Sequence, residues 1–566
     1  MRVELRSRIN QGICRERVGG EAHEAGVKVP SADSLDCDAR PGSAEPLGRC
    51  AAHSPGNGSA EGSVARTSEY FLKHRAGQIQ VRETVRRPLQ VMKFGGTSVG
   101  DESCIARVSE IIRAASRDND VVVVVSAIGG VTDKLIEAAT QSEAGNRKAV
   151  AAIFAELRQR HDVVVSMLIS SPAEQNRIRK EMQEIFEEGD RLCEGTILLR
   201  ELTPRTLDSI SSLGERLSAP LLAAVLAQHG VTSEAIEATE LVVTDSDHGA
   251  ADPWMNPTRE LCEARLRPLL LRGVVPVVTG FIGATAEGVL TTLGRGGSDY
   301  SATILAAALD ADEVIIWTDV DGLLTADPRL VPGTCTVPEI SYREAAELAH
   351  FGAKVLHPKT LRAVMQCGIP LWIRNTFAPN QSGTKISPSG TASGGGVKAL
   401  TAIGDLSLVT VGGPGIVGIP DVLGRTFATT AAVRADVLLI SQSSSQNNIC
   451  LIVSSAQAKR TVEALRLEFA QDLAHEKVEH IALDPAVAIV TVVGQNMRGV
   501  SGIAGRTFCA LGRENVDIIA IAQGSSECNI SFVVAQKDMK AALVTTHREF
   551  ELGHCKFATV APSVLT

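Results

Sequence analysis

A lysine followed by two glycines forms the first group of residues whose types suggest chemistry: Lys93, Gly95 and Gly96 in "VMKFGGTSV" (91–99). A P-loop reads GxxxxGK[ST], with the lysine after the glycines, so this pattern is a different one. The apolar run before Lys93 predicts a β-strand that carries the lysine to its carboxyl end. Glycines let backbone N–H groups approach a phosphate closely, and Lys93 supplies a point charge. The stretch therefore indicates a phosphate site; a βα turn that needs glycine only for its geometry is the alternative.

A second glycine-rich stretch, "TTLGRGGSDYSATILAAAL" (291–309), follows an apolar segment and opens a helical pattern. Gly296, Gly297 and Ser298 would place backbone amides and the positive end of a helix dipole at an anion. Arg295 and Asp299 flank that position, where a carboxylate makes sense if it orients cationic groups or a Mg²⁺ ion. The alternative is that Ser298 or Asp299 only caps the helix.

A third polar group follows a buried-strand pattern in "IIWTDVDGLLTADPRL" (315–330), with Thr318, Asp319, Asp321, Asp327 and Arg329. Asp-Gly turns are common after strands, so taken alone this stretch indicates a turn. Ligands of open α/β sheets, however, bind beyond the carboxyl ends of the strands, and all three stretches occupy such ends. Together they predict one binding crevice.

Two further positions are less specific. Glu215 begins a helical pattern in "SSLGERLSAPLL" (211–222), and Lys354 lies in "AHFGAKVLHPKT" (349–360). A first-turn partner of the helix dipole and a solvated helix lysine are the alternatives for these two residues.

The elements that must position these residues are short β-branched runs separated by helical patterns, from residue 89 onward. Runs such as "DVVVVVSA" (120–127) and "EVIIWTDVDG" (313–322) have the length of buried strands, and this alternation predicts an α/β fold with a mainly parallel sheet. Residues 1–88 are rich in small and charged residues and show no sustained period, so we expect a disordered extension. A transit peptide is the alternative, but such peptides avoid acids, and this segment carries Glu4 and Asp33 among others.

An internal repeat follows the Gly/Ser-rich stretch "SPSGTASGGG" (387–396). The same spacing of 81 residues separates Asp436 from Asp517 and Gln442 from Gln523, within segments that align without a gap. Each copy reads as a strand, a glycine-rich turn, a helix through "GRTF" and two more strands, which predicts two small ferredoxin-like α+β domains. We place a catalytic region at 89–386, a linker at 387–398, one small domain at 399–484 and a second, with a C-terminal return segment, at 485–566.

Composition narrows the class of partner. The formal net charge of −9 is spread along the chain without a basic stripe, which argues against nucleic acid or a membrane surface. The twelve cysteines contain no CxxC pair, so we expect neither a disulfide framework nor a metal site, and a cytoplasmic location. The apolar runs are shorter than a membrane span. Small soluble ligands are the expected partners.

Taken in order, these motifs resemble aspartate kinase. The resemblance runs from about residue 89 to the C-terminus and rests on seven motifs: "KFGGTSV" (93–99), Ser126 in "VVSA", "GERLS" (214–218), "GRGGSDYSA" (294–302), "TDVDG" (318–322), "DPR" (327–329) and "FGAKVLHP" (351–358). It implies the amino-acid-kinase fold followed by two ACT domains. The repeat looks closest to the kinase and regulatory part of bifunctional aspartate kinase–homoserine dehydrogenases, without the dehydrogenase.

The resemblance implies transfer of a phosphoryl group from ATP, as its Mg²⁺ complex and without a prosthetic group, to L-aspartate. It makes Lys93 and Asp299 catalytic. The residues that it implies for the substrate L-aspartate are Ser126, Thr132, Glu215 for the ammonium and Arg295 for the α-carboxylate. Those implied for ATP are Lys93, Gly95, Gly96, Ser98, Gly296, Gly297, Ser298, Thr318, Asp319, Leu324, Arg329, Lys354 and Val355. Leu324 departs from the family, which often carries tyrosine there, so we expect altered nucleotide affinity.

The paired ACT domains imply an amino-acid effector and a homodimer or higher oligomer. Gln442 and Gln523 precede serine-rich turns, and their amides both donate and accept hydrogen bonds, so we expect them to bind the effector. Solvated turn residues, duplicated with their domain, are the alternative. The stretches "SQSSS" and "AQGSS" resemble the threonine-responsive branch. The rival functions are a sibling kinase with another carboxylate substrate and a regulatory sensor without catalysis.

Overall fold

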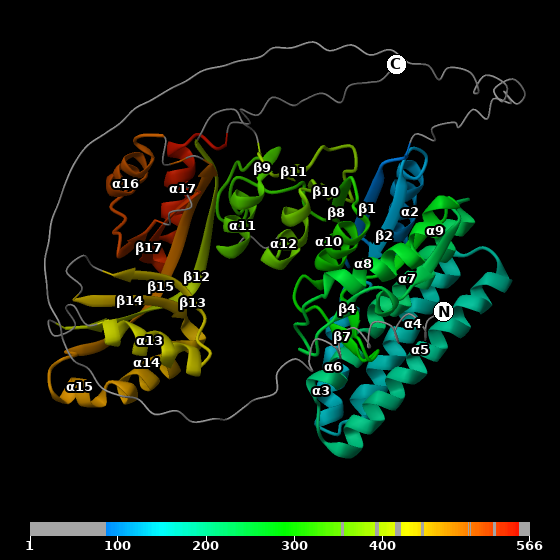
Figure 1. Cartoon of the computed structure of the whole chain (residues 1–566), viewed down its shortest axis with the longest axis horizontal. Helices are drawn as coiled ribbons and strands as arrows, with labels where there is room; N and C mark the ends of the chain where they lie inside the picture. The colour runs from blue at the N-terminus through cyan, green and yellow to red at the C-terminus, as the bar shows by residue number, and fades with distance from the viewer. Residues whose placement is uncertain are drawn as a thin grey trace, which may run out of the picture. The chain divides into compact units, whose positions relative to one another are not determined.

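The computed structural model describes residues 86–352, 356–390, 396–413, 420–442, 447–495, 497, 500–523 and 528–553 (Figure 1). The expected extension lies outside this part except for its last three residues. Arg87 donates from Nη2 to the carbonyl oxygens of Ser116 (2.6 Å) and Asn119 (2.8 Å). The N–H of Asp120 donates to the carbonyl oxygen of Pro88 at 2.9 Å. The packed fold therefore includes Arg87, two residues before the boundary drawn from the sequence.

A mainly parallel sheet forms the centre of the larger region, as predicted. Its order in the described residues is β3-β5-β2-β1-β8-β10-β11-β9, and only the pairing of β10 with β11 is antiparallel. The strands are β1 (Leu89–Phe94), β2 (Asp120–Val125), β3 (Ser233–Ile236), β5 (Val275–Thr279), β8 (Glu313–Thr318), β9 (Glu339–Ser341), β10 (Leu371–Asn375) and β11 (Thr384–Ser387). Continuous valine in β2 suits a strand that is buried on both faces.

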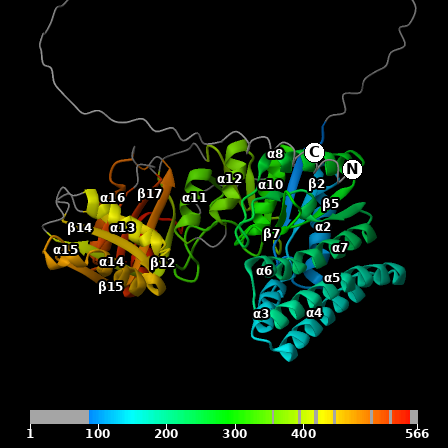
Figure 2. The same cartoon turned by 60° about the horizontal axis from the view of Figure 1, so that its bottom comes forward.

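Helices cover both faces of this sheet, and each face has its own apolar core. One face carries α2 (Glu102–Ala115), α3 (Val131–Glu143), α4 (Arg147–Leu168), α5 (Pro172–Leu199), α6 (Pro204–Ser211) and α7 (Leu213–Gln228). The other carries α8 (Met255–Arg265), α9 (Arg267–Leu271), α10 (Gly297–Leu309), α11 (Tyr342–His350) and α12 (Pro358–Cys367). The long helices α4 and α5 lie side by side (Figure 2). This layering brings the carboxyl ends of β1, β2 and β8 to one edge, beside the start of α10.

The helical stretch Pro204–Gln228 has the length and composition of a membrane span, with a mean hydropathy of 1.2. Its most apolar window is 89% buried inside the protein, which is typical of a core helix. A small sheet of order β4-β6-β7 lies beside the main one and consists of β4 (Val243–Thr244), β6 (Ile282–Thr285) and β7 (Leu290–Thr292). The strand β7 leads directly into the glycine-rich stretch before α10.

The C-terminal region is an antiparallel sheet with helices, of order β13-β14-β12-β15-β17-β16 in the described residues. Its strands are β12 (Gly396–Gly412), β13 (Val437–Gln442), β14 (Asn448–Ser454), β15 (His480–Gln495), β16 (Ala520–Ala522) and β17 (Asn529–Ala535). Its helices are α13 (Pro420–Ala432), α14 (Ser455–Glu468), α15 (Ala470–Ala474), α16 (Ile503–Arg513) and α17 (Met539–Glu549). The predicted order of helix and strands is present in both copies.

The repeat extends to individual contacts. The Arg425 guanidinium lies 4.5 Å from the centroid of the Phe469 ring, and the equivalent Arg506 lies 4.6 Å from that of Phe550. Each arginine also pairs with a glutamate, Arg425 with Glu468 and Arg506 with Glu549. Two copies of one unit have thus kept the same helix-to-helix connection.

The long strands β12 and β15 belong to both copies. The first part of β12, from Gly396 to Ile403, pairs with the end of β15, while its second part, to Gly412, pairs with the beginning of β15 and with β14. The first copy is therefore inserted into the second, and a division of the chain at residue 484 does not separate two sheets. The expected linker at 387–398 also needs correction, because its last three residues begin β12; residues 391–395 lie outside the described part.

Helix α11 connects the two regions through side chains. The buried Lys398 Nζ of β12 lies 2.9 Å from Glu344 Oε2, which also accepts the backbone N–H of Ser341 in a capping box. At the other end of the helix, Thr401 Oγ1 donates to the carbonyl oxygen of Phe351 at 2.7 Å. The helix is thus fixed at both ends to a strand of the C-terminal sheet.

Candidate active site

One cavity of about 510 Å³ brings together most of the residues predicted to handle phosphate and substrate. It lies where β1, α3 and the start of α10 meet. Of the predicted residues, those that line it are Lys93, Ser126, Thr132, Arg295, Gly296, Gly297, Ser298 and Asp299. Residues about 200 positions apart in the chain share this cavity because α10 packs against β1.

Lys93 and Asp299 form an ion pair at the cavity wall, with Nζ 2.5 Å from Oδ1. Both side chains are more than four-fifths buried, at 11% and 15% exposure. Gly95 lies beside this pair, because a Cβ added there would meet Lys93 Nζ at 3.2 Å. A side chain at this position would crowd the ammonium, which would have to move by a few tenths of an ångström. The small size of Gly95 thus suits the position of Lys93 Nζ.

The amino end of α10 opens into the same cavity. Its N-cap is Gly296, in the left-handed region with φ +72°, and no side chain caps the helix. The alternative in which Ser298 or Asp299 is the cap is therefore wrong. The N–H of Gly297 donates to the carbonyl oxygen of Gly294 at 2.9 Å, so the N–H groups of Ser298 and Asp299, in the same first turn and close to Lys93, are the ones that suit an anion.

Glu215 lies in the first turn of α7 and is buried. It accepts a hydrogen bond from the backbone of Ala127, but its Oε2 has no hydrogen-bond partner among the described residues. Burial raises the pKa of this carboxyl to about 8, and the positive charge of Lys93 opposes part of that rise. Glu215 does not line the cavity, yet its interaction with Lys93 places it close by. A buried carboxylate oxygen without a partner suits a cationic group of a ligand.

The remaining predicted nucleotide residues that the structure describes, apart from Gly95, Gly96 and Ser98, lie at the end of β8 and beyond and do not line the cavity. Thr318 ends β8, and its Oγ1 donates to Asp319 Oδ1 at 3.3 Å. Arg329 pairs with Asp327 at 2.6 Å and its side chain is exposed. Leu324 is half-buried. Lys354 and Val355 lie outside the described residues, so the nucleotide half of the site stays a prediction.

Two other predicted phosphate residues have structural partners. The buried Ser98 hydroxyl lies 2.7 Å from Thr376 Oγ1 and 3.3 Å from the carbonyl oxygen of Trp317. Gly96 faces a neighbouring turn, where an added Cβ would meet the carbonyl oxygen of Ala127 at 3.1 Å. Neither residue lines the cavity. Ser98 holds the loop after β1 to β8 and to the end of β10, and Gly96 lies against the loop after β2.

Sequence reasoning missed three groups around the site. Arg160 of α4 donates to the carbonyl oxygens of Gly129 (2.7 Å) and Gly100 (2.9 Å) and so connects the loop after β2 to the loop after β1. Phe281 lines the cavity with φ +68°, which is unusual for a side chain of this size. Asp208 of α6 also lines the cavity. None belongs to a motif, and no local pattern marks them.

The two predicted effector glutamines lie at the ends of the two edge strands of the C-terminal sheet. Gln442 ends β13 and Gln523 follows β16, and both are exposed. Ser441 Oγ donates to the carbonyl oxygen of Ile521 at 3.4 Å, which sets the two strand ends side by side. The equivalent residues of the two copies thus share one surface.

Comparison with known proteins gives two family matches. The Amino acid kinase family matches residues 88–375, and the ACT domain matches residues 409–469 and 490–550. The chain is 33% identical over 476 residues to bifunctional aspartokinase/homoserine dehydrogenase 1, chloroplastic, of Arabidopsis thaliana, covering 83% of this chain and 52% of that protein. It is 29% identical to aspartokinase 1, chloroplastic, of the same plant, covering 81% and 80%. The chain spans about half the length of the bifunctional relatives that it matches.

Solved structures agree with this comparison. Aspartokinase III of E. coli, in complex with aspartate and ADP, matches with a TM-score of 0.70 at 29% identity, over 82% of this chain and all of that one. The same enzyme in complex with lysine and aspartate matches with a TM-score of 0.66. The likeness extends over both the parallel sheet and the C-terminal antiparallel region.

Proposed function

Because the chain belongs to the amino acid kinase family and carries two ACT-domain copies, we propose that it is an aspartate kinase. It transfers the γ-phosphoryl group of ATP, bound as its Mg²⁺ complex, to the side-chain carboxylate of L-aspartate. The products are 4-phospho-L-aspartate and ADP. The observation that carries this proposal is the Lys93–Asp299 pair beside the uncapped start of α10, in one cavity with Arg295.

The reaction needs positive charge and alignment more than proton transfer. The carboxylate of aspartate is ionised at neutral pH, so an oxygen of this group attacks the γ-phosphorus without a general base. The bond from phosphorus to the β,γ-bridging oxygen breaks, and ADP leaves with its electron pair. Lys93 lies between the two anions and lowers their repulsion, while Asp299 holds its ammonium in place. The N–H groups at the start of α10 bind phosphate oxygens.

The substrate is held at its α-groups. Arg295 pairs with the α-carboxylate, and Glu215 offers its unpartnered Oε2 to the ammonium. A buried acidic side chain for the α-ammonium and a cationic side chain for the α-carboxylate together select an amino acid over a simple dicarboxylate. Thr318, Asp319, Arg329 and Lys354 hold the nucleotide.

The function is tested by incubating the purified full chain with MgATP, hydroxylamine and a panel of acids. The panel contains aspartate, glutamate, N-acetylglutamate and succinate. We expect a hydroxamate and ADP with aspartate only, because hydroxylamine traps an acyl phosphate. A hydroxamate with glutamate or N-acetylglutamate instead would identify a sibling kinase. Binding of an amino acid without any ADP would identify a regulatory sensor.

We further propose that the chain acts at the first step of the aspartate pathway to lysine, threonine and methionine, under feedback control by threonine. It acts as a homodimer or higher oligomer through the C-terminal sheets, which is supported by the exposure of Ile440 (47%) on β13 and Ile521 (46%) on β16. A cytoplasmic location is part of this proposal and rests on the scattered spacing of the twelve cysteines in the sequence.

Threonine is expected to inhibit the enzyme, and Gln442→Ala and Gln523→Ala are expected to weaken that inhibition. Coupling between effector and active site is typically about 1–3 kcal/mol, so the inhibition constant should rise about fivefold or more. Activity is titrated with threonine, lysine and methionine. Gln471→Ala, a change of an exposed glutamine on α15, is the control. Inhibition by lysine alone would contradict the choice of threonine and leave the kinase proposal intact.

A further inference from the structure

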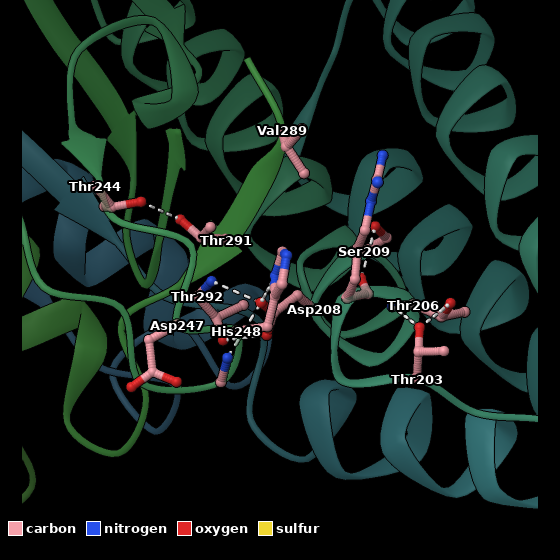
Figure 3. Close-up of polar contacts among 12 residues, drawn as sticks. Thr203, Thr206, Asp208, Ser209, Thr244, Asp247, His248, Val289, Thr291 and Thr292 are labelled. Atoms are coloured by element: carbon pink, nitrogen blue, oxygen red, sulfur yellow. Dashed lines mark hydrogen bonds and ion pairs between the residues drawn. The ribbon is translucent and has the colours of Figure 1, made fainter. Parts of the chain in front are cut away.

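Asp208 on α6 is a buried carboxylate that connects three backbone segments beside the cavity (Figure 3). Its Oδ2 accepts hydrogen bonds from His248 Nδ1 (2.7 Å), the N–H of Gly249 (3.1 Å) and the N–H of Thr292 (3.2 Å). Its Oδ1 accepts the hydroxyl of Thr292 at 2.5 Å. Four donors thus converge on one side chain.

The donors belong to two backbone segments: one leads into the glycine-rich stretch, and the other lies against it. His248 and Gly249 lie in the turn before α8, and Thr292 is the last residue of β7, three positions before Arg295. The two segments touch, because a Cβ added to Gly294 would meet the carbonyl oxygen of Gly249 at 2.8 Å. The N–H of Ala251 also donates to the carbonyl oxygen of Thr292 at 3.0 Å. The backbone that carries Arg295 therefore rests on contacts made by Asp208.

Most of the acceptor capacity of Asp208 is used within the protein. Its Oδ2 accepts three hydrogen bonds and its Oδ1 accepts one, from the Thr292 hydroxyl. Glu215, one helix further on, keeps an oxygen without a partner in the described part of the chain. The two buried acids near the site thus differ in their surroundings: Glu215 keeps an oxygen for a substrate cation, whereas both oxygens of Asp208 accept hydrogen bonds from the protein.

We propose that Asp208 is a positioning residue that sets the affinity for the amino-acid substrate by fixing the backbone of Arg295. The proposal rests on the proposed function, since Arg295 must bind the α-carboxylate of aspartate. The nucleotide residues at the end of β8 make no contact with Asp208 among the described residues. Loss of Asp208 should therefore raise the KM for aspartate and spare the KM for ATP.

The variants form a graded series. Asp208→Asn keeps one oxygen for three of the donors, and its amide can donate to the Thr292 hydroxyl, so it loses charge but retains part of the network. Asp208→Ala removes every acceptor. Thr292→Val removes one hydrogen bond and keeps the shape, while Thr292→Ser keeps the hydroxyl. Asp247→Asn is the matched control, because Asp247 is exposed in the same turn and lies outside the cavity lining.

The KM for aspartate is expected to rise about tenfold in Asp208→Asn and about a hundredfold in Asp208→Ala, since a displacement of a binding group by about 1 Å can cost a hundredfold. Thr292→Val should raise it about threefold, and Thr292→Ser should restore most of the loss. The KM for ATP should stay within about twofold throughout. Asp247→Asn should match the parent in both.

A cycle with Arg295→Ala separates positioning from a general structural role. If Asp208 acts through Arg295, adding Asp208→Asn to Arg295→Ala should change the KM for aspartate by less than about twofold. Equal rises in both KM values, or full additivity in the cycle, would overturn the proposal. If Asp208→Ala does not fold, the two Thr292 variants and Asp208→Asn decide. If the parent phosphorylates no aspartate, the proposed function itself is refuted. If the parent is active but its variants raise the KM for aspartate no more than the KM for ATP, only the role of Asp208 is refuted.

Discussion

Replacing Lys93 by methionine is expected to lower kcat with aspartate and ATP about a hundredfold or more, with little change in either KM. The ammonium is preorganised by Asp299 at 2.5 Å and buried at the cavity wall, where removal of one fixed charge typically costs about 3–4 kcal/mol of transition-state stabilisation. Methionine keeps the length and apolar contacts of the lysine stem. Steady-state rates measured by release of ADP give kcat and both KM values.

The control for this change is Lys134→Met on α3. Lys134 pairs with Glu137 and Glu156 at the protein surface, so this change also removes one positive charge from the region, and it should leave kcat near that of the parent. A Lys93→Met variant with normal kcat and a raised KM for ATP alone would assign the lysine to ground-state binding of the nucleotide.

Replacing Glu215 by glutamine is expected to raise the KM for aspartate at least about tenfold and to leave the KM for ATP within about twofold. The amide keeps the shape but loses the charge that pairs with the substrate ammonium. In a buried site, loss of one charged partner typically costs about 1.5–3 kcal/mol or more. Glu188→Gln on α5, whose parent residue pairs with Arg216 at a more exposed position, is a suitable control. A rise in the KM for ATP instead would place Glu215 near the nucleotide.

The pKa of Glu215 also predicts how the affinity for aspartate depends on pH. With a pKa of about 8, the carboxyl of the free protein is protonated at pH 6 to 7 and must lose its proton to pair with the ammonium. The KM for aspartate should therefore fall as pH rises from 6 toward 8 and then level off. The glutamine variant has no proton to lose, so its KM should be flat over this range.

The same shift makes a prediction about stability. A carboxyl whose folded pKa is raised from 4.5 to about 8 contributes stability that is complete below pH 4.5 and is lost as pH rises through 8. Without substrate, the free energy of unfolding of Glu215→Gln at pH 8 should thus exceed that of the parent by on the order of a few kcal/mol, so the variant should unfold at a higher temperature. At pH 5 the two proteins should unfold at similar temperatures. A variant less stable than the parent at pH 8 would show that the carboxylate has a partner in the free protein.

The strands that hold the site could be predicted because each is a local pattern. The strands β1, β2 and β8 are mostly apolar and are followed by glycine, serine or aspartate, so both their burial and the polar ends could be inferred. The repeat was readable from the constant spacing of Gln442 and Gln523. These features depend on neighbouring residues, which a single sequence contains in full.

The parts that could not be predicted depend on contacts distant in the chain. Asp208 stands in an ordinary helical stretch, and its role follows only from donors 40 and 84 positions away. The predicted linker ran three residues into β12 because "GVK" at the start of that strand continues a glycine-rich stretch. Lys398 falls in that predicted linker, yet it is buried against Glu344 of a helix 54 positions earlier.

The shared strand β12 also constrains the order in which the C-terminal region is assembled. Gly396 pairs with Gln495 and Gly412 with His480, so β12 leaves the ribosome well before its partner strand exists. A long strand with unpaired N–H and C=O groups is a template for pairing with other chains. Neither copy can complete its sheet until β15 has been synthesised, and the second copy also needs β17 and β16, which follow β15 in the chain. The two similar units are therefore joined by shared strands into one sheet, and neither contains all of its own strands in one continuous segment.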